Sequence, residues 1–526
     1  MDLMGHALAG ITAVFLGPEA FSILGLPISI TLVMILLGFL MGITVGATPG
    51  LAGPMAMAIS LPILISIFGF SQDAFLPVMS FLIGIMKGAT VGGCVPAILF
   101  NTPGTPDAFM TTLDGFPMAQ KGQAKKALKV AHLSSVTGDT FSDIVLIFCA
   151  PFLAVLVEGY LDLPEKTGLL ILSLAFIASV IGGSVGKGLI SMGLGLLAAM
   201  VATGEDFYPR LTMGAPALSD GFPIATAVLG VLILGEVFKA MEDLARGQGT
   251  RTPQRGAAIE GDRLSLADLR RMGPNIARSS VIGTAIGALP GVGSTLAATL
   301  GYTSAKARYA KTKAPEDPAF GTGAIEGIAA TEAANSSVSG ANLIPVLSLG
   351  IPGNAAAVFL ILGMDSIGGF NPGPGVFQVP SEGVNEEMVL VFGLFTAMFV
   401  TNGLNWTIGG VFMRVVGVMA RVPKAMLLPV VLLLTLTAIY VEETSMSAMW
   451  IAVGFGVLGY LMRRSGMSPL PFVIAFILGG NLEQTARQAF SATGGDPFFL
   501  FSSPIAFAFV ALAVLVVVLN LRKGDA

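Results

Sequence analysis

The chain has 526 residues, of which 54% are hydrophobic and only 11% are charged. Soluble globular proteins carry about 25% charged residues. Lys and Arg total 28 against 32 Asp and Glu, which gives a net charge of −4, and the mean hydropathy is +0.83. These values exclude a soluble enzyme, a disordered protein and a nucleic-acid binder with a basic surface.

Long apolar runs recur along the chain, many of them close to the ~20 residues that a helix needs to cross a membrane. Short polar or Gly/Pro-rich turns separate them. We therefore predict an all-α polytopic membrane protein with about twelve hydrophobic segments. In chain order, the runs are 28–45, 54–70, 75–86, 141–157, 168–181, 188–201, 225–237, 388–412, 425–439, 448–461, 471–478 and 499–519.

The chain contains 67 Gly and 31 Pro, an unusual number for packed helices. Irregular backbone at membrane depth is tolerated only where protein or a cavity satisfies its polar groups. This composition predicts broken or re-entrant helices, which are typical of transporters.

A polar stretch at 239–278 divides the apolar runs into two sets. We interpret it as a cytoplasmic loop that ends in a short surface helix. Ser265 would cap this helix, and Asp268 follows three residues later. The predicted organisation is a first membrane half at 1–238, a linker at 239–278 and a second membrane half at 279–526.

Two motifs occur once in each half. Gly46-Ala-Thr-Pro-Gly50 recurs at 287–291, with its proline 241 residues further on. The spacing Pro-x6-Pro-Gly occurs at 96–104 and again at 345–353, 249 residues later. Two ordered matches at similar offsets predict an internal repeat.

The basic residues predict the orientation of the chain. They cluster at 121–129, 239–278, 306–313 and 522–523, which places these segments and the C-terminus in the cytoplasm. The first copy leads into lysines, whereas the second leads into Asp365 and Glu382 with no Lys or Arg from 314 to 413. The segments that follow the two copies therefore lie on opposite sides of the membrane. The repeat is predicted to be inverted, with a shared site near the bilayer midplane.

The repeated motifs predict a substrate site for an anion. Pro and Gly break a helix and leave backbone N–H groups free, and the start of the next half-helix attracts a carboxylate. Simple proline kinks that only assist packing are the alternative. The predicted substrate-binding residues are Thr48, Pro49, Gly50, Asn101, Thr102, Pro103, Gly104, Thr105, Gly350, Ile351, Pro352, Gly353 and Asn354.

Two groups of polar residues are candidates for the coupling ion. Asp139 and Asp143 lie one turn apart on one helix face, where they form either a proton path or a water-facing start of the helix. Glu332, Asn335 and Ser336 precede the second Pro-x6-Pro-Gly motif, and their oxygens suit Na⁺ or H⁺. The alternative is that these residues only cap helices. Na⁺ is the only metal predicted, and no cofactor is expected.

We expect no enzymatic activity. The sequence has no Gly-x-Ser-x-Gly, no His-Glu-x-x-His and no Walker motif. An intramembrane aspartyl protease is the alternative from another class, although its two acids would need to face one another from separate helices.

At these motifs the chain resembles the large membrane subunit of the tripartite tricarboxylate transporters. Lys87 stands where an aromatic residue is expected. The resemblance runs in family order over most of the chain, at residues 46–50, 92–106, 114–122, 287–291, 327–335, 349–353 and 371–375.

This resemblance implies a bacterial inner-membrane secondary carrier for di- and tricarboxylates such as citrate, driven by an H⁺ or Na⁺ gradient. It also implies two partners, a small membrane subunit of about four spans and a periplasmic substrate-binding protein. A stand-alone ion-coupled carboxylate carrier is the alternative. Membrane lipid is expected around the chain, and nucleic acid is not expected as a partner.

Overall fold

The computed structural model describes residues 2–23, 25–48, 51–181, 184–202, 210–247, 264–291, 293–312, 317–370, 372–380, 382–417 and 424–524. Contacts divide the chain into two compact units. Unit 1 comprises Met1–Ala154, Thr250–Leu289 and Gly293–Leu427, and unit 2 comprises Val155–Gly249, Pro290–Val292 and Leu428–Ala526. The halves 1–238 and 279–526 follow from a sequence repeat, which these contacts do not test, so that division stays a prediction.

The all-α polytopic prediction is confirmed, since every predicted apolar run lies largely within helices. Within the described residues, the strands are limited to one short hairpin, β1 (Glu19–Ile23) and β2 (Leu26–Ser29). Shorter apolar helices accompany the longer ones. In the part of the chain that the structure describes, eight helical stretches are long and apolar enough to cross a membrane: Gln72–Phe100, Pro106–Tyr160, Leu163–Val180, Ile224–Ala245, Glu386–Val416, Ala425–Glu443, Met446–Arg464 and Pro504–Arg522.

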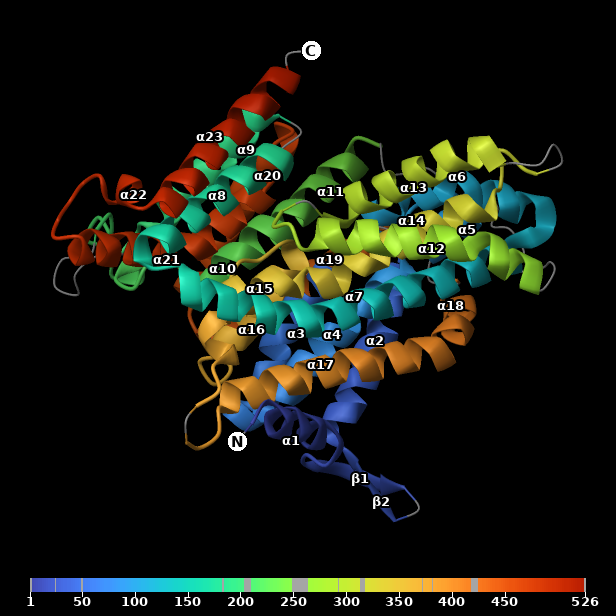
Figure 1. The fold of residues 1–526 in the computed structure, drawn as a ribbon, viewed down its shortest axis with the longest axis horizontal. Helices are drawn as coiled ribbons and strands as arrows, with labels where there is room; N and C mark the ends of the chain where they lie inside the picture. The colour runs from blue at the N-terminus through green and yellow to red at the C-terminus, as the bar shows by residue number, and fades with distance from the viewer. Residues whose placement is uncertain are drawn as a thin grey trace. The chain divides into compact units, whose positions relative to one another are not determined.

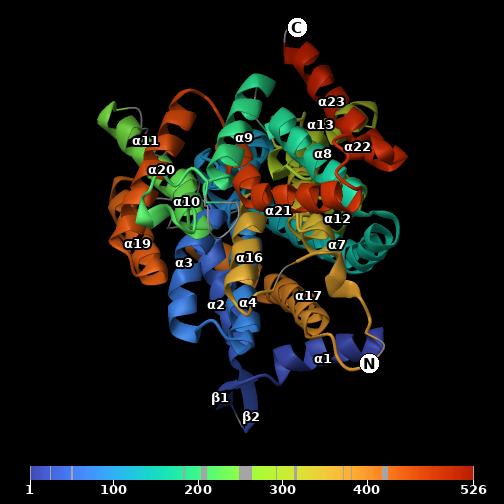
Figure 2. The same cartoon turned by 90° about the vertical axis from the view of Figure 1, so that its left-hand side faces the viewer.

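Unit 1 begins with α1 (Leu3–Phe15) and the hairpin, which lie at one end of its helices (Figures 1 and 2). Ser29 then caps α2 by accepting a hydrogen bond from the Leu32 N–H at 3.3 Å. The next helices are α2 (Ile30–Gly46), α3 (Gly53–Phe68), η1 (Gln72–Ala74) and α4 (Phe75–Gly92).

Helices α2 and α4 pack unusually closely. A Cβ atom on Gly42 would lie 2.5 Å from the Ile85 carbonyl oxygen, and one on Gly46 would lie 2.2 Å from the Ala89 oxygen. Only glycine allows two helix backbones to approach this closely, so Gly42 and Gly46 determine how α2 packs on α4.

Helix α4 leads into a broken element. It stops at Gly93, and α5 (Cys94–Phe100) continues to a non-helical tip at 101–105. The chain then re-enters helical structure and runs into the long α7. The elements after the tip are η2 (Pro106–Ala108), α6 (Phe109–Met118), η3 (Ala119–Gln123) and α7 (Ala124–Tyr160).

The second part of unit 1 repeats this order. The capping box of Ser265 and Asp268 is present, as predicted, but the helix that it begins, α12, is 22 residues long rather than a short surface helix. After a break the chain continues through a second tip at 350–354. The elements are α12 (Leu266–Gly287), α13 (Gly293–Thr312), α14 (Ile325–Ala341), α15 (Leu343–Leu349), α16 (Ala355–Ser366), η6 (Pro374–Phe377), α17 (Glu386–Leu404), η7 (Asn405–Gly409) and α18 (Gly410–Val416).

Unit 2 is a separate helical bundle in which α8 packs on α23, and α9 and α8 pack on α21. Gly459 approaches the backbone of η5 closely, since its Cβ would lie 2.2 Å from the Val231 oxygen. Helices α7 and α19 (Lys424–Glu443) contribute residues to both units. The other elements are α8 (Leu163–Ile181), α9 (Val185–Ala199), η4 (Pro216–Leu218), α10 (Ile224–Leu229), η5 (Gly230–Leu234), α11 (Gly235–Ala245), α20 (Met446–Arg464), α21 (Leu470–Ala492), α22 (Phe499–Ser502) and α23 (Pro504–Gly524).

Candidate functional site

The first tip is a tight left-handed turn at the end of α5. Asn101 has φ 52°, and the Thr102 N–H donates to the Pro96 oxygen at 3.3 Å. The Gly104 N–H donates to the Gly93 oxygen at 3.2 Å, so the tip folds back on the break after α4. A Cβ atom on Gly104 would lie 2.0 Å from the Gly46 oxygen, so only glycine fits at this position.

The second tip has the same local geometry. Gly350 ends α15 with φ 69°, and the Ile351 N–H donates to the Pro345 oxygen at 3.2 Å. Gly353 also faces the preceding break, because its Cβ would lie 2.6 Å from the Asn342 Oδ1 atom. The two tips therefore share a left-handed residue, a hydrogen bond back to the first proline and a glycine packed on the break.

Matched contacts extend into the helices that precede the tips. Gly42 and Gly46 of α2 contact Ile85 and Ala89 of α4. In α12 the residues 241 positions later, Gly283 and Gly287, contact residues of α14 that lie 249 positions after those of α4, namely Ala334 and Val338. The same helix pairing thus occurs twice at the offsets of the sequence motifs.

The two copies also contact each other. Asp107, just after the first tip, accepts a hydrogen bond at 3.0 Å from the hydroxyl of Thr295 at the start of α13. In the corresponding arrangement, α16 after the second tip packs on α3, the helix that follows motif 46–50. Figure 2 shows α16 beside α3 and α4.

The predicted substrate residues differ in their exposure. Asn101 is exposed, Thr102 and Pro103 are half-buried, and Gly104 and Thr105 are buried. The Thr105 hydroxyl is buried and has no hydrogen-bond partner among the described residues.

On the second tip, Ile351, Pro352 and Gly353 are buried, while Gly350 and Asn354 are half-buried. Asn354 caps α16, since its Oδ1 atom accepts from the Ala357 N–H at 2.9 Å. That oxygen therefore serves the helix, and only the amide nitrogen remains as a donor.

The third set of predicted residues, 48–50, follows α2. Thr48 is buried, and its hydroxyl donates to the Thr44 carbonyl oxygen at 2.8 Å. Its proton is thus used within the helix. Pro49 and Gly50 lie outside the described residues.

Glu332 lies in the middle of α14 and is fully buried. Its carboxylate accepts hydrogen bonds from the hydroxyls of Thr111 on α6 and Ser135 on α7, the latter at 2.9 Å. No Lys or Arg pairs with it among the described residues, in contrast to Glu326, which binds Arg271 at 2.8 Å. A carboxylate that is held only by hydroxyls can take up a proton or a small cation.

Asn335 and Ser336 lie on the next turn of α14 and are each 1% exposed. Both polar atoms of the Asn335 side chain and the Ser336 hydroxyl have no partner among the described residues. Since buried polar groups are normally hydrogen-bonded, these oxygens are available to a ligand. Neither residue caps a helix end, because α14 continues to Ala341.

Asp139 and Asp143 are buried and bind one lysine. Each accepts a hydrogen bond from the Lys87 ammonium at 2.7 Å, and the Asn402 Oδ1 atom lies 3.3 Å from the same nitrogen. Ser339 donates to Asp139, and Asn402 donates to Asp143. The expectation that this helix face could be a water-facing start is wrong, because the two aspartates are 2% and 1% exposed.

Lys87 completes this cluster, although the sequence pattern did not place it in a site. It lies on α4, is 1% exposed, and joins α4 to α7 and α17. Its charge inside an apolar segment was the available signal, since an ionisable residue at membrane depth almost always has a partner. The ammonium already occupies the cation position between the two aspartates.

Comparisons with known proteins identify the family of this chain. The family model described as "Tripartite tricarboxylate transporter TctA family" matches residues 32–474. A protein of Agrobacterium vitis, named "Uncharacterized 52.8 kDa protein in TAR-I ttuC' 3'region", is 32% identical over 478 residues, covering 89% of each chain. A second protein of this organism, "Uncharacterized protein in TAR-II ttuC' 3'region", is 31% identical over 244 residues, covering 45% of this chain and 93% of its own length. No solved structure matches.

Proposed function

Because this chain belongs to the tripartite tricarboxylate transporter TctA family, we propose that it carries di- and tricarboxylates, such as citrate, across the bacterial inner membrane. It would act as the large membrane subunit, together with a small membrane subunit of about four spans and a periplasmic substrate-binding protein. An ion gradient would drive uptake, and the chain would have no enzymatic activity. The observation that carries the proposal is the pair of tips with the same geometry within one unit.

The substrate would bind at the tips through backbone N–H groups and neutral side chains. Residues 101–105 and 350–354 contain no Lys or Arg, so helix starts and amide or hydroxyl donors would supply the positive ends that a carboxylate needs. The buried Thr105 hydroxyl, which has no partner among the described residues, supports this role. The exposed Asn101 side chain is the second donor that we place there.

The coupling ion would bind at Glu332, Asn335 and Ser336. Their carboxylate, amide and hydroxyl oxygens suit Na⁺, and protonation of Glu332 would serve H⁺ equally well. Asp139 and Asp143 are less suited to an external cation, because Lys87 already binds both. Their buried cluster would instead hold α4, α7 and α17 together while an ion binds next to it.

We further propose that the repeat is inverted and that the C-terminus is cytoplasmic. The matched contacts of α2 with α4 and of α12 with α14 support the repeat. The opposite charge of the segments that follow the two copies supports the inversion. This arrangement would place the two tips at one site near the bilayer midplane.

Uptake by site variants tests the substrate assignment. Asn101→Gly keeps the left-handed conformation but removes the amide, so we expect labelled citrate uptake by the complete system to fall about tenfold or more. Asn275→Ala, at a partly exposed asparagine of α12, is the matched control and should match wild type. Wild-type uptake by Asn101→Gly, at equal amounts of protein in the membrane, would contradict the site.

The same assay tests the ion assignment. Glu332→Gln removes the charge and keeps one oxygen that can accept from Thr111 or Ser135, while its amide nitrogen can donate to the other hydroxyl. We expect it to abolish accumulation against a gradient. Glu382→Gln, at an exposed position, is the control. Imposing a Na⁺ gradient or a pH gradient separately identifies the ion, and normal accumulation by Glu332→Gln under both would exclude this residue.

A further inference from the structure

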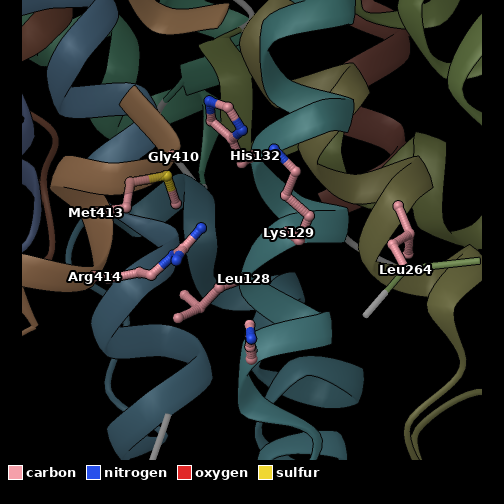
Figure 3. Close-up of a pocket in the computed structure, with 8 residues that line it drawn as sticks. Leu128, Lys129, His132, Leu264, Gly410, Met413 and Arg414 are labelled. Carbon is pink, nitrogen blue, oxygen red and sulfur yellow. The ribbon is translucent and has the colours of Figure 1, made fainter. Parts of the chain in front are cut away.

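Unit 1 contains a cavity of about 370 Å³ between α7 and α18, and none of the tip residues lines it (Figure 3). Its walls combine cationic and apolar side chains, and its described lining includes no acidic residue. The lining residues are Lys125, Leu128, Lys129, His132, Leu264, Gly410, Met413 and Arg414.

Three cations converge on this cavity. Lys125 and Lys129 lie one turn apart on α7. Arg414 extends from α18 toward the side of the cavity that Lys129 lines (Figure 3). In the part of the chain that the structure describes, none of the three forms an ion pair. Like charges held close together repel each other, so a bound anion would stabilise the arrangement.

His132 also faces this cavity. It is 1% exposed, and its Nε2 atom lies 2.9 Å from the Asn405 carbonyl oxygen, which can only accept a hydrogen bond. The proton of the neutral ring therefore belongs on Nε2. Nδ1 is therefore a buried acceptor without a partner in the described residues, and Figure 3 shows the Lys129 side chain reaching toward this ring. A carboxylate in the cavity would pair with Nδ1 only when the ring carries a second proton.

We propose that this cavity is a second anion site, which binds a small polycarboxylate. The Arg414 guanidinium can hold a carboxylate through two parallel hydrogen bonds, and the lysines can neutralise further charges. Leu128, Leu264 and Met413 fit the carbon skeleton, and the volume is that of a small-molecule pocket. The choice of a carboxylate rests on the proposed function.

The site is joined to the buried lysine cluster. His132 contacts Asn405 in η7, and Asn402, one turn earlier, binds Lys87 and Asp143. The helix forms a π-bulge between the two sites at Asn405–Gly409, a distortion that is frequent at functional positions. An anion in the cavity would therefore contact α7 and the helical stretch Glu386–Val416, both of which also contribute residues to the cluster.

Direct binding to the purified full chain in detergent tests the inference. We expect the double variant Lys129→Gln with Arg414→Gln to weaken citrate binding at one of two sites by about tenfold or more. Lys306→Gln with Arg522→Gln removes the same charge at exposed positions and should leave both sites unchanged. Acetate, with one carboxylate, should bind far more weakly than citrate.

The outcomes separate this inference from the proposed function. Loss of one citrate site in the double variant, with the other site lost only in Asn101→Gly, supports both. Loss in the double variant alone supports the cavity and counts against the tips. Unchanged citrate binding in the double variant overturns the inference. If that variant instead changes only the binding of phosphatidylglycerol, supplied in nanodiscs, the cavity would be assigned to a lipid headgroup and the inference is likewise overturned.

Discussion

Lys87 shows how one residue can bind three helices of a membrane protein. Its ammonium, carried on α4, contacts oxygens of Asp139 and Asp143 on α7 and of Asn402 on α17. Burial of a charge is unfavourable unless partners compensate it. Here two carboxylates and an amide oxygen compensate the ammonium. The cluster retains one negative charge when Lys87 and both aspartates are ionised.

Removal of this lysine should destabilise the protein. Lys87→Met leaves two carboxylates buried together without a counter-charge, and breaking a buried ion pair costs about 3–5 kcal/mol. We expect a lower midpoint of thermal unfolding in detergent. Adding Asp139→Asn and Asp143→Asn should restore much of it.

Lys306→Met, at an exposed lysine, is the control and should unfold at the wild-type temperature. An unchanged midpoint for Lys87→Met would show that the cluster adds no stability. A drop that the two added Asn substitutions do not reduce would show that lost packing, rather than unpaired charge, is the cause.

At this scale, part of the cluster was predictable from the sequence. The spacing of Asp139 and Asp143 predicted one shared helix face, and both indeed reach the same ammonium. Their partner was not predictable, because it lies 52 and 56 residues away in sequence. Burial depends on which helix packs against that face, and periodicity carries no information about it.

Among the helices, glycines determine how the elements pack. A Cβ on Gly104 would lie 2.0 Å from the Gly46 oxygen and 2.9 Å from the Pro96 ring. The first tip thus rests directly on the C-terminal end of α2. The breaks themselves were predictable from Pro and Gly, because these residues end helices for local reasons.

Gly104→Ala should therefore displace the tip. The added methyl group meets backbone on α2, which cannot move without disturbing its contact with α4, and overpacking costs about 1–3 kcal/mol. We expect reduced thermal stability together with loss of citrate binding at the tips. Gly159→Ala, on α7 with open space around its Cβ, should retain both, and a Gly104→Ala variant with wild-type binding would contradict the close approach of α2 and the tip.

The start of α12 provides a pH-dependent test. Burial alone would raise the pKa of the Asp268 carboxyl, but hydrogen bonds and charge from Lys126 and hydrogen bonds from Ser265 outweigh it and hold the pKa below its usual value. A lowered pKa means that Asp268 stabilises the folded state above the unfolded pKa of about 3.9. This contribution to stability is lost as the pH falls through the pKa that Asp268 has in the folded protein.

We therefore expect Asp268→Asn to lower the unfolding midpoint at pH 7, and the difference from wild type to shrink as the pH falls from 6 toward 3. Measuring both proteins across this range in one detergent checks the sign. A difference that stays constant with pH would show that the carboxylate charge plays no part.

For the whole molecule, the membrane class and the broken helices were predictable from the sequence, but the two contact units were not. Unit 1 combines residues from both predicted halves, including both tips and the Glu332 site. Such long-range grouping depends on packing between distant helices, which no local pattern encodes. The length of α12 was underestimated for a similar reason, since its polar first turn is stabilised by an ion pair between Asp268 and Lys126, which is distant in sequence.

The central claim concerns a carrier that works with two partners. The measurement that tests it most directly is the uptake of labelled di- and tricarboxylates into proteoliposomes, with this chain alone, with the small subunit, and with the binding protein also present. We predict uptake only in the complete set and only under an imposed Na⁺ or H⁺ gradient. Equal uptake by the chain alone would contradict the claim and establish a stand-alone carrier.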